Sequence, residues 1–291
     1  MPGTEITQAG VPGLYGKLPA RGDFVSRRLD ADFVADWDAW LQRVMAASRE
    51  ALGERWLECF LSAPVWRFVM PAGMFSRPGW AGLVIPSVDR VGRYFPLTVA
   101  APIREESIDV PSTLRKALPW LDALETLSLE ALAPQLDFED FDRRLAELAM
   151  ADDVPLVVGA SDDTVPLGAA VARFEVWPLG DAADAAIERL MQERSLPERA
   201  SALWMTKGGE TVAACVAACG GLISGAQFCA MLDGRWQEHS WTLGRELSCD
   251  PKTRGVDCDR VQGKSAKDPQ LDAHPEPSSE HETAMDAKSE Q

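Results

Sequence analysis

The sequence contains little histidine, the side chain on which most nucleophilic mechanisms depend. Three histidines occur in 291 residues, at His239, His274 and His281. A Ser-His-Asp or Cys-His mechanism needs a histidine that takes the proton of the nucleophile. His274 and His281 fall in a C-terminal segment that we expect to be disordered, and His239 lies at the edge of the folded part. The composition therefore argues against an enzyme of this class.

Ligands for a metal ion or a nucleotide are also sparse. The closest set for zinc is Cys215, Cys219 and Cys229, but the spacing of the first two is loose for a metal knuckle and no fourth ligand lies near. Asp152–Asp153 and Asp162–Asp163 could offer carboxylates to Mg²⁺, although adjacent acids are common in loops. The phosphate-binding patterns GxxxxGKS/T and GxGxxG do not occur. We predict no metal, no cofactor and no small-molecule substrate.

Export and membrane signals are absent from the sequence. The N-terminal stretch MPGTEITQAGVPG lacks the basic start and apolar run of a signal peptide. No segment approaches the ~18 uninterrupted apolar residues of a spanning helix. We therefore expect a cytoplasmic protein with reduced cysteines and no membrane insertion. In that compartment Arg21-Gly22-Asp23 would not be the adhesion ligand that this tripeptide forms in exported proteins.

Basic residues are outnumbered, with 29 lysines and arginines against 45 acids and a formal net charge of -16. Binding to a phosphate backbone needs clustered Lys and Arg, so we predict no nucleic-acid partner.

The chain is expected to contain one folded domain. Residues 1–12 are predicted to be flexible, residues 13–248 to form an α/β domain, and residues 249–291 to be a disordered acidic tail. After Asp250 the sequence has no aromatic residue and only isolated aliphatic ones, so it cannot bury enough apolar area to offset the entropy of ordering.

Periodicity within the domain predicts helices and short strands. Helices are expected over Asp32–Leu52, which Gly53 ends or kinks, and over Glu54–Leu61, Ser112–Leu132, Asp137–Met150, Ala182–Arg194 and Gly225–Leu232. Strands are expected over Val65–Met70, Trp80–Pro86, Tyr94–Pro102, Val154–Val158 and Ser201–Thr206, the first three in a possible antiparallel meander. Val212–Cys219 fits a strand or a buried helix, with the strand favoured. This order suggests one sheet covered by helices on both faces.

Two segments place polar residues among aromatic ones. The loop Pro86–Leu97 holds Asp89, Arg90 and Arg93 between two strands. Asp89 could stabilise the turn and pair with an arginine, or the loop could be a recognition loop, since Arg and Trp are enriched at binding hot spots. Asp23 is predicted to cap a helical turn at Phe24 and Val25.

Several stretches resemble a known family. They are GLYGKLPARGDFVSRRL with WDAWL, then APVWRF, then WAGLVIPSVDRVGRYFPLTVAAP. Together they are similar to the TagF family, also called ImpM, of type VI secretion system accessory proteins. Weaker likeness in LPWLDALETLSLEAL, SALWMTKGGE and FCAMLDGRW extends the resemblance from Gly13 to Trp236.

The resemblance implies a three-layer α/β/α sandwich with a largely antiparallel sheet. It also implies a cytoplasmic, non-enzymatic repressor that acts after translation by engaging a forkhead-associated-domain scaffold protein of the secretion system. Two alternatives stay open: a structural subunit of the apparatus, or a metal-dependent phosphatase that uses Asp152, Asp153, Asp162 and Asp163. The acidic tail matches no family pattern.

The strongest motifs also suggest a binding site. We expect their polar residues to converge on one patch that binds the partner protein; the alternative is that each stabilises its own loop. The residues concerned are Lys17, Asp23, Arg67, Asp89, Arg90 and Arg93.

Overall fold

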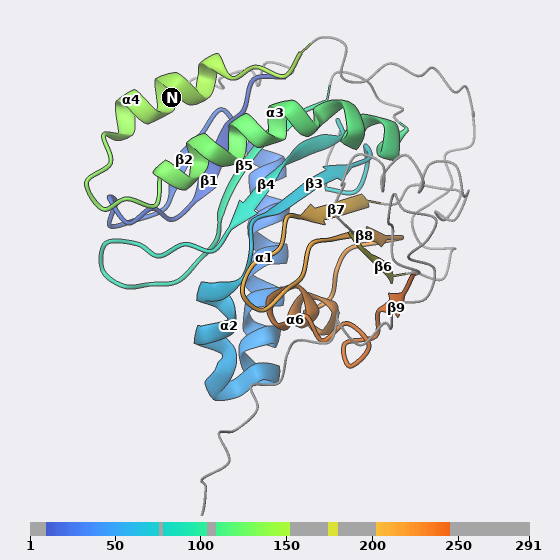
Figure 1. Cartoon of the computed structure of the whole chain (residues 1–291). Helices are drawn as coiled ribbons and strands as arrows, with labels where there is room; N and C mark the ends of the chain where they lie inside the picture. The colour runs from blue at the N-terminus through green and yellow to red at the C-terminus, as the bar shows by residue number, and fades with distance from the viewer. Residues whose placement is uncertain (1–9, 76–77, 104–108, 152–173, 180–201, 245–291) are drawn as a thin grey trace, which may run out of the picture.

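A nine-stranded sheet forms the centre of the protein in a computed structural model that describes residues 10–75, 78–103, 109–151, 174–179 and 202–244 (Figure 1). The strand order is β2-β1-β5-β4-β3-β7-β8-β6-β9, and all neighbours are antiparallel except β6 and β9. The prediction of a mixed α/β fold with a largely antiparallel sheet is confirmed. The strands are β1 Gly13–Gly16, β2 Val25–Arg27, β3 Trp66–Met70, β4 Trp80–Ile85, β5 Leu97–Pro102, β6 Phe174–Pro178, β7 Ala202–Thr206, β8 Cys215–Cys219 and β9 Thr242–Leu243.

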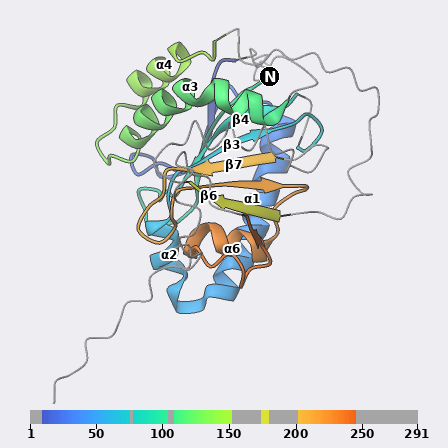
Figure 2. The same cartoon turned by 45° about the vertical axis from the view of Figure 1, so that its right-hand side comes forward.

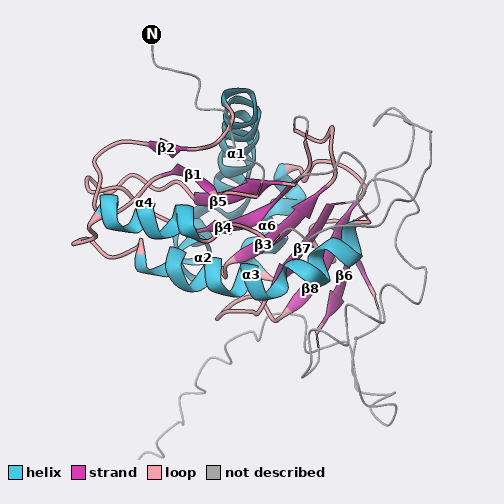
Figure 3. Cartoon of the chain, turned by 90° about the horizontal axis from the view of Figure 1, so that it is seen from above, coloured by secondary structure: helices cyan, strands magenta, loops and turns pink. Residues whose placement is uncertain are grey.

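The helices form two groups, each packed on its own hydrophobic core. One core joins α1, α2 and α6 to the sheet, and the other joins α3 and α4 to it. Figure 1 shows α3 and α4 above the strands with α2 and α6 below, and in Figure 3 the strands pass between α1 and α3. The helices are α1 Ala31–Leu52, α2 Trp56–Ser62 after a 3-10 turn at Gly53–Arg55, α3 Val110–Glu130, α4 Phe138–Glu147 and α6 Gly225–Asp233.

The core under α1 is rich in aromatic rings. Trp37 stacks on Phe33 with 5.4 Å between ring centroids, and its indole N–H donates to the Thr98 hydroxyl at 2.8 Å. Trp40 donates to the Ile223 carbonyl at 2.8 Å, which ties α1 to the start of α6. A buried indole needs such an acceptor because its N–H would otherwise lose water without compensation. These contacts fix α1 on the sheet.

The core under α3 is mainly aliphatic. Leu114, Leu121 and Leu124 are fully buried together with sheet residues such as Leu83 and Val99. With Leu118, which is also buried, they recur every three or four residues and form the stripe that periodicity predicts for a helix on a sheet. Figure 2 shows β3, β7 and β6 between α3 above and α6 below.

Carboxylates cap the helices where the sequence predicts their starts. Asp30 accepts from the N–H groups of Asp32 and Phe33 at the start of α1, and Asp109 and Asp137 cap α3 and α4. A side-chain oxygen at this position satisfies backbone donors that lack a helical partner. The helices predicted over Asp32–Leu52, Glu54–Leu61, Ser112–Leu132, Asp137–Met150 and Gly225–Leu232 are confirmed, with ends displaced by a few residues.

The meander of β3, β4 and β5 is confirmed, as is the strand reading of the segment that ends at Cys219. The capping role of Asp23 is wrong. Its carboxylate accepts from the Phe24 N–H at 2.8 Å, but strand β2 follows, because Val25–Arg27 pairs with β1 instead of entering a helix. Strands β1, β2, β6 and β9 were not predicted.

Strand β1 has the sequence GLYG, and its two glycines obscure the apolar alternation by which a strand is predicted. It begins at Gly13, where a Cβ atom would lie 2.4 Å from the Arg27 carbonyl oxygen, so the close approach of β2 requires glycine. Several predictions lie outside the described residues: the flexible start over residues 1–9, the strand Val154–Val158, the helix Ala182–Arg194, the end of the predicted domain over residues 245–248, and the whole acidic tail over residues 249–291.

Candidate protein-binding site

The buried carboxylate of Asp89 organises the loop between β4 and β5. One oxygen accepts from the backbone N–H groups of Val91 and Arg93 at 3.0 and 2.9 Å. The other accepts from the Lys17 ammonium at 2.8 Å and from the Arg93 guanidinium at 2.7 Å. The Gly92 N–H donates to the Asp89 carbonyl, and Gly92 has a φ of +87°, a conformation that glycine adopts without strain. The carboxylate therefore sets the path of the whole loop.

Lys17 links this loop to the segment after β1. Its side chain is buried against Asp89, and the Ser87 hydroxyl donates to the Lys17 carbonyl at 2.7 Å. The ammonium also lies 4.9 Å from the centre of the Phe24 ring, a cation–π contact. A buried lysine must be paired to be tolerated, and here the pair joins two distant segments. Residues 17–24 and 86–97 are thus one unit in space.

Two arginines complete the link between the segments. The Arg93 guanidinium donates to the Gly22 carbonyl at 2.6 Å. The backbone N–H of Arg90 donates to the Arg21 carbonyl at 2.8 Å. The Arg90 guanidinium passes 3.3 Å from the position that a Gly22 Cβ atom would occupy. Arg90 and Arg93 therefore lie beside the Arg21-Gly22-Asp23 turn, with their side chains at the surface.

Burial alone would raise the pKa of Asp89, but hydrogen bonds outweigh this effect. The Lys17 ammonium, the backbone and guanidinium of Arg93 and the Val91 N–H all stabilise the ionised form, so the pKa of Asp89 lies well below its usual range. The carboxylate is therefore charged at neutral pH. Its charge is compensated inside the protein by Lys17 and Arg93.

The six predicted residues do not all meet. Lys17, Asp89, Arg90 and Arg93 converge, and Asp23 is exposed on the turn that they contact. Arg67 has a different place, so the prediction of one patch is wrong for this residue.

Arg67 lies in the core between β3 and α3. Its guanidinium donates to Glu125 at 2.7 Å and to Asp122 at 2.5 Å, and only 1 % of its surface is exposed. Alternation along β3 turns Arg67 away from Trp66 and Phe68, which face α1. The Leu83 partner of Arg67 in the ladder belongs to the same aliphatic core. Arg67 thus fastens α3 to the sheet.

Asp122 receives a second cation, since Lys207 lies 2.8 Å away just beyond β7. Burial would raise the pKa of Asp122, but hydrogen bonds from Lys207 and Arg67 lower it. The Asp122 carboxylate is therefore ionised at neutral pH.

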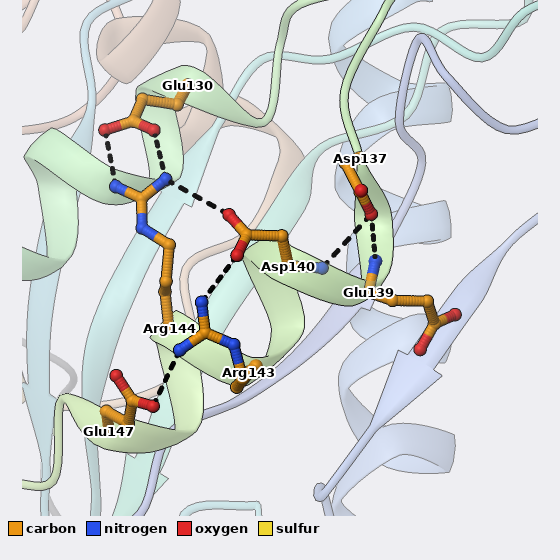
Figure 4. Close-up of polar contacts among 7 residues, drawn as sticks. All are labelled: Glu130, Asp137, Glu139, Asp140, Arg143, Arg144 and Glu147. Carbon is orange, nitrogen blue, oxygen red and sulfur yellow. Dashed lines mark hydrogen bonds and ion pairs between the residues drawn. The ribbon is translucent and has the colours of Figure 1, made fainter.

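Helix α4 carries an exposed network of ion pairs (Figure 4). Arg144 binds both oxygens of Glu130 at 2.7 and 3.0 Å, and Arg143 binds Asp140 at 2.5 Å and Glu147 at 2.8 Å. The groups are about half exposed, so water and salt screen each pair. The network links the end of α3 to α4 at the surface.

The described cysteines lack the exposure and the low pKa of reactive thiols. Cys59, Cys215, Cys219 and Cys229 are buried free thiols. Burial raises the pKa of Cys229 to about 11 and that of Cys215 further, which suppresses the reactive thiolate. Within the described ranges no group of three His, Cys, Asp or Glu side chains is placed to hold a metal ion. The candidate acids Asp152, Asp153, Asp162 and Asp163 lie outside those ranges.

His239 lies beside Asp233, with 3.1 Å between the ring nitrogen Nε2 and a carboxylate oxygen. The same carboxylate accepts from the Arg235 N–H at 3.0 Å. The pair closes the turn after α6.

The comparisons with known proteins agree with this architecture. The model of the TagF N-terminal domain, described as type VI secretion system-associated, matches residues 13–148. The crystal structure of PA0076 from Pseudomonas aeruginosa PAO1 matches with 32% sequence identity and a TM-score of 0.60. The alignment covers 77% of this chain and 94% of that one.

The chain belongs to the TagF family. The match begins at β1 and ends just after α4, so both segments around Asp89 lie in the TagF N-terminal domain. This TagF-family protein is therefore type VI secretion-associated. No curated protein matches it, and none of the described helices has the length and apolar content to span a bilayer.

Sequence reasoning missed the apolar part of this site. Phe24 and Val91 are exposed next to the arginines. A usable signal was available, because each is an apolar residue that directly follows a charged one, Asp23 or Arg90, in a segment predicted to turn. Residues of this kind usually point into the core, which is why the pattern alone did not single them out.

Proposed function

We propose that this protein is a non-enzymatic negative regulator of type VI secretion that acts after translation by binding a forkhead-associated-domain scaffold protein of the system. The observation that carries the proposal is the match of the TagF N-terminal domain over residues 13–148. That region contains the two segments joined by Asp89, which present arginines at the surface. Arginine combines a large contact area with directed hydrogen bonds, so it is frequent at binding hot spots.

The chemistry of the described residues supports a binding role. The four buried thiols are poor nucleophiles because burial raises the pKa of Cys59, Cys215, Cys219 and Cys229. We further propose that the protein works in the cytoplasm and that its sheet and two helix groups constitute a three-layer α/β/α sandwich. A rigid scaffold of this kind suits a protein that presents loops to a partner.

Secretion by a deletion strain tests the proposal. Deletion of the gene should raise the amount of type VI substrates in the medium while the cellular level of the apparatus proteins stays constant. Complementation with the intact gene should restore repression. Unchanged secretion in a strain whose apparatus is otherwise active would contradict the regulatory role.

Two other functions predict different results. A structural subunit would remain with the assembled apparatus during fractionation, and its deletion would abolish secretion. A metal-dependent phosphatase would hydrolyse p-nitrophenyl phosphate with added Mg²⁺ or Mn²⁺, and substitution of Asp152 or Asp162 would remove that activity. We expect neither result.

A further inference from the structure

We propose that the exposed side chains of Arg21, Phe24, Arg90, Val91 and Arg93 form one contact surface, the loop-end surface. Its partner is a protein that presents carboxylates beside an apolar patch. This inference rests on the proposed function in one respect, namely that the protein acts by binding another protein.

The loop-end surface is fixed before a partner arrives. Arg90 and Arg93 are tied to the turn at Arg21 and Gly22 by hydrogen bonds of 2.8 and 2.6 Å. The buried Asp89 holds the loop from within. Binding therefore requires little ordering of the backbone, which lowers the entropic cost of association.

Apolar side chains stand next to these arginines. Val91 is 65% exposed at the tip of its loop, and Phe24 is 42% exposed. The Phe24 ring is held in place by packing against Phe95 and Tyr15, at 4.9 and 5.6 Å between centroids, and the rest of it remains at the surface. Exposed apolar groups beside arginine are typical of the centre of a protein interface.

Helix α2 extends the same end of the molecule. The Tyr94 ring, in the β4–β5 loop, contacts the Trp56 and Phe60 rings of α2 at 6.3 and 6.2 Å between centroids. One turn apart on α2, Leu57 and Leu61 are 40% and 54% exposed. The other large apolar residues exposed in the described part of the chain are Leu129 and Leu222. Two of these six residues, Phe24 and Val91, belong to the loop-end surface, and two others, Leu57 and Leu61, belong to the helix that its loop contacts; Figure 1 shows where α2 lies.

The two segments that form the loop-end surface have a net charge opposite in sign to that of the whole protein. Residues 17–24 and 86–97 contain four basic and two acidic side chains, a net charge of +2 in a chain of net charge -16. Asp89 is buried between Lys17 and Arg93, and no carboxylate of the described residues lies within 4.0 Å of the Arg90 guanidinium. Among the described residues, Arg21 is the one arginine of this surface that has an exposed acidic neighbour, Glu139 at 3.7 Å. Charge complementarity therefore selects an acidic partner.

Charge reversal at Arg90 tests the loop-end surface. The probe is the purified forkhead-associated-domain scaffold protein of the same secretion system, titrated against the intact chain. Arg90→Glu and Val91→Asp should each weaken binding about tenfold or more, and Arg90→Glu should also reduce its dependence on salt. The matched controls are Arg115→Glu and Leu129→Asp, which change exposed side chains on α3 and should bind as the wild type does. Circular dichroism verifies that each variant is folded.

A second measurement separates the surface from the identity of the partner. The photo-crosslinking residue p-benzoylphenylalanine replaces Val91 in living cells, with the same replacement of Leu129 as the control. A crosslink from position 91 to one identified acidic protein, reduced by Arg90→Glu, supports the loop-end surface even if the scaffold protein does not bind. In that case only the proposed partner is wrong.

Three results would overturn the inference. The scaffold protein could bind the wild type and both loop variants equally, which would leave the proposed function standing. Position 91 could yield no crosslink while the scaffold protein does not bind. The crosslink could instead join position 91 to residues 245–291 of the same chain, which would make the acidic tail the occupant.

Discussion

Arg67 and Asp89 are both buried charges held by opposite charges, yet they have different effects on the molecule. The Arg67 guanidinium donates its hydrogen bonds to carboxylates of α3 inside the domain. Asp89 binds Lys17 inside and Arg93 at the surface, and it shapes a loop that faces solvent. A buried ion pair in a sequence motif can therefore stabilise the scaffold or shape a surface loop. Only the residues with which it pairs distinguish the two roles.

Removal of Arg67 should have the largest effect on stability. Arg67→Met leaves Glu125 and Asp122 without their buried cation, so we expect a loss of about 3 kcal/mol in the free energy of unfolding. Urea denaturation followed by tryptophan fluorescence measures it. The double variant Arg67→Leu with Glu125→Leu should recover much of the loss, because it removes both buried charges. A loss below about 1 kcal/mol for Arg67→Met would mean that Arg67 does not fasten α3.

Asp89→Asn should destabilise the protein less than Arg67→Met does, and the size of its effect should depend on pH. The folded pKa of Asp89 lies below its unfolded value of about 3.9. The contribution of the ionised Asp89 to the free energy of unfolding is therefore complete above about pH 4 and is lost as the pH falls further. The urea midpoint of Asp89→Asn should lie below that of the wild type at pH 7, and the difference should shrink between about pH 4 and pH 2. A difference that is constant with pH would contradict the charged role of Asp89.

Arg144→Ala should have the smallest effect. Its ion pairs with Glu130 and Asp140 are exposed and screened (Figure 4). The urea midpoint should stay within error of the wild-type value at physiological salt. If Arg144→Ala destabilised the protein as much as Arg67→Met, burial would not be what separates these two arginines.

Much of the fold could be predicted from local pattern. The apolar stripe of α1 and the aspartates that cap α1, α3 and α4 act through neighbouring residues, so the sequence itself contains the signal. The meander of β3, β4 and β5 follows from short connections between apolar runs. The alternation of a strand is likewise enough to put Arg67 on the face of β3 opposite Trp66 and Phe68.

Other features depend on contacts between distant segments. Strand β1 forms because β2 and β5 pair with it, and its glycines hide it from propensity rules. The convergence of Lys17 with Asp89 was predicted from motif strength, but the partners of Arg67 lie 55 and 58 residues away on α3. Nothing in the local sequence around Arg67 distinguishes a core arginine from a binding one. The sheet topology makes this distinction, because it places Arg67 beneath α3.

The binding of Arg90→Glu and Arg67→Met to the forkhead-associated-domain scaffold protein tests the account most directly. Both variants are measured at a temperature where circular dichroism shows them folded. We predict that Arg90→Glu weakens binding about tenfold or more, while Arg67→Met binds as the wild type does. The reverse pattern, with normal binding by Arg90→Glu and lost binding by folded Arg67→Met, would contradict the account.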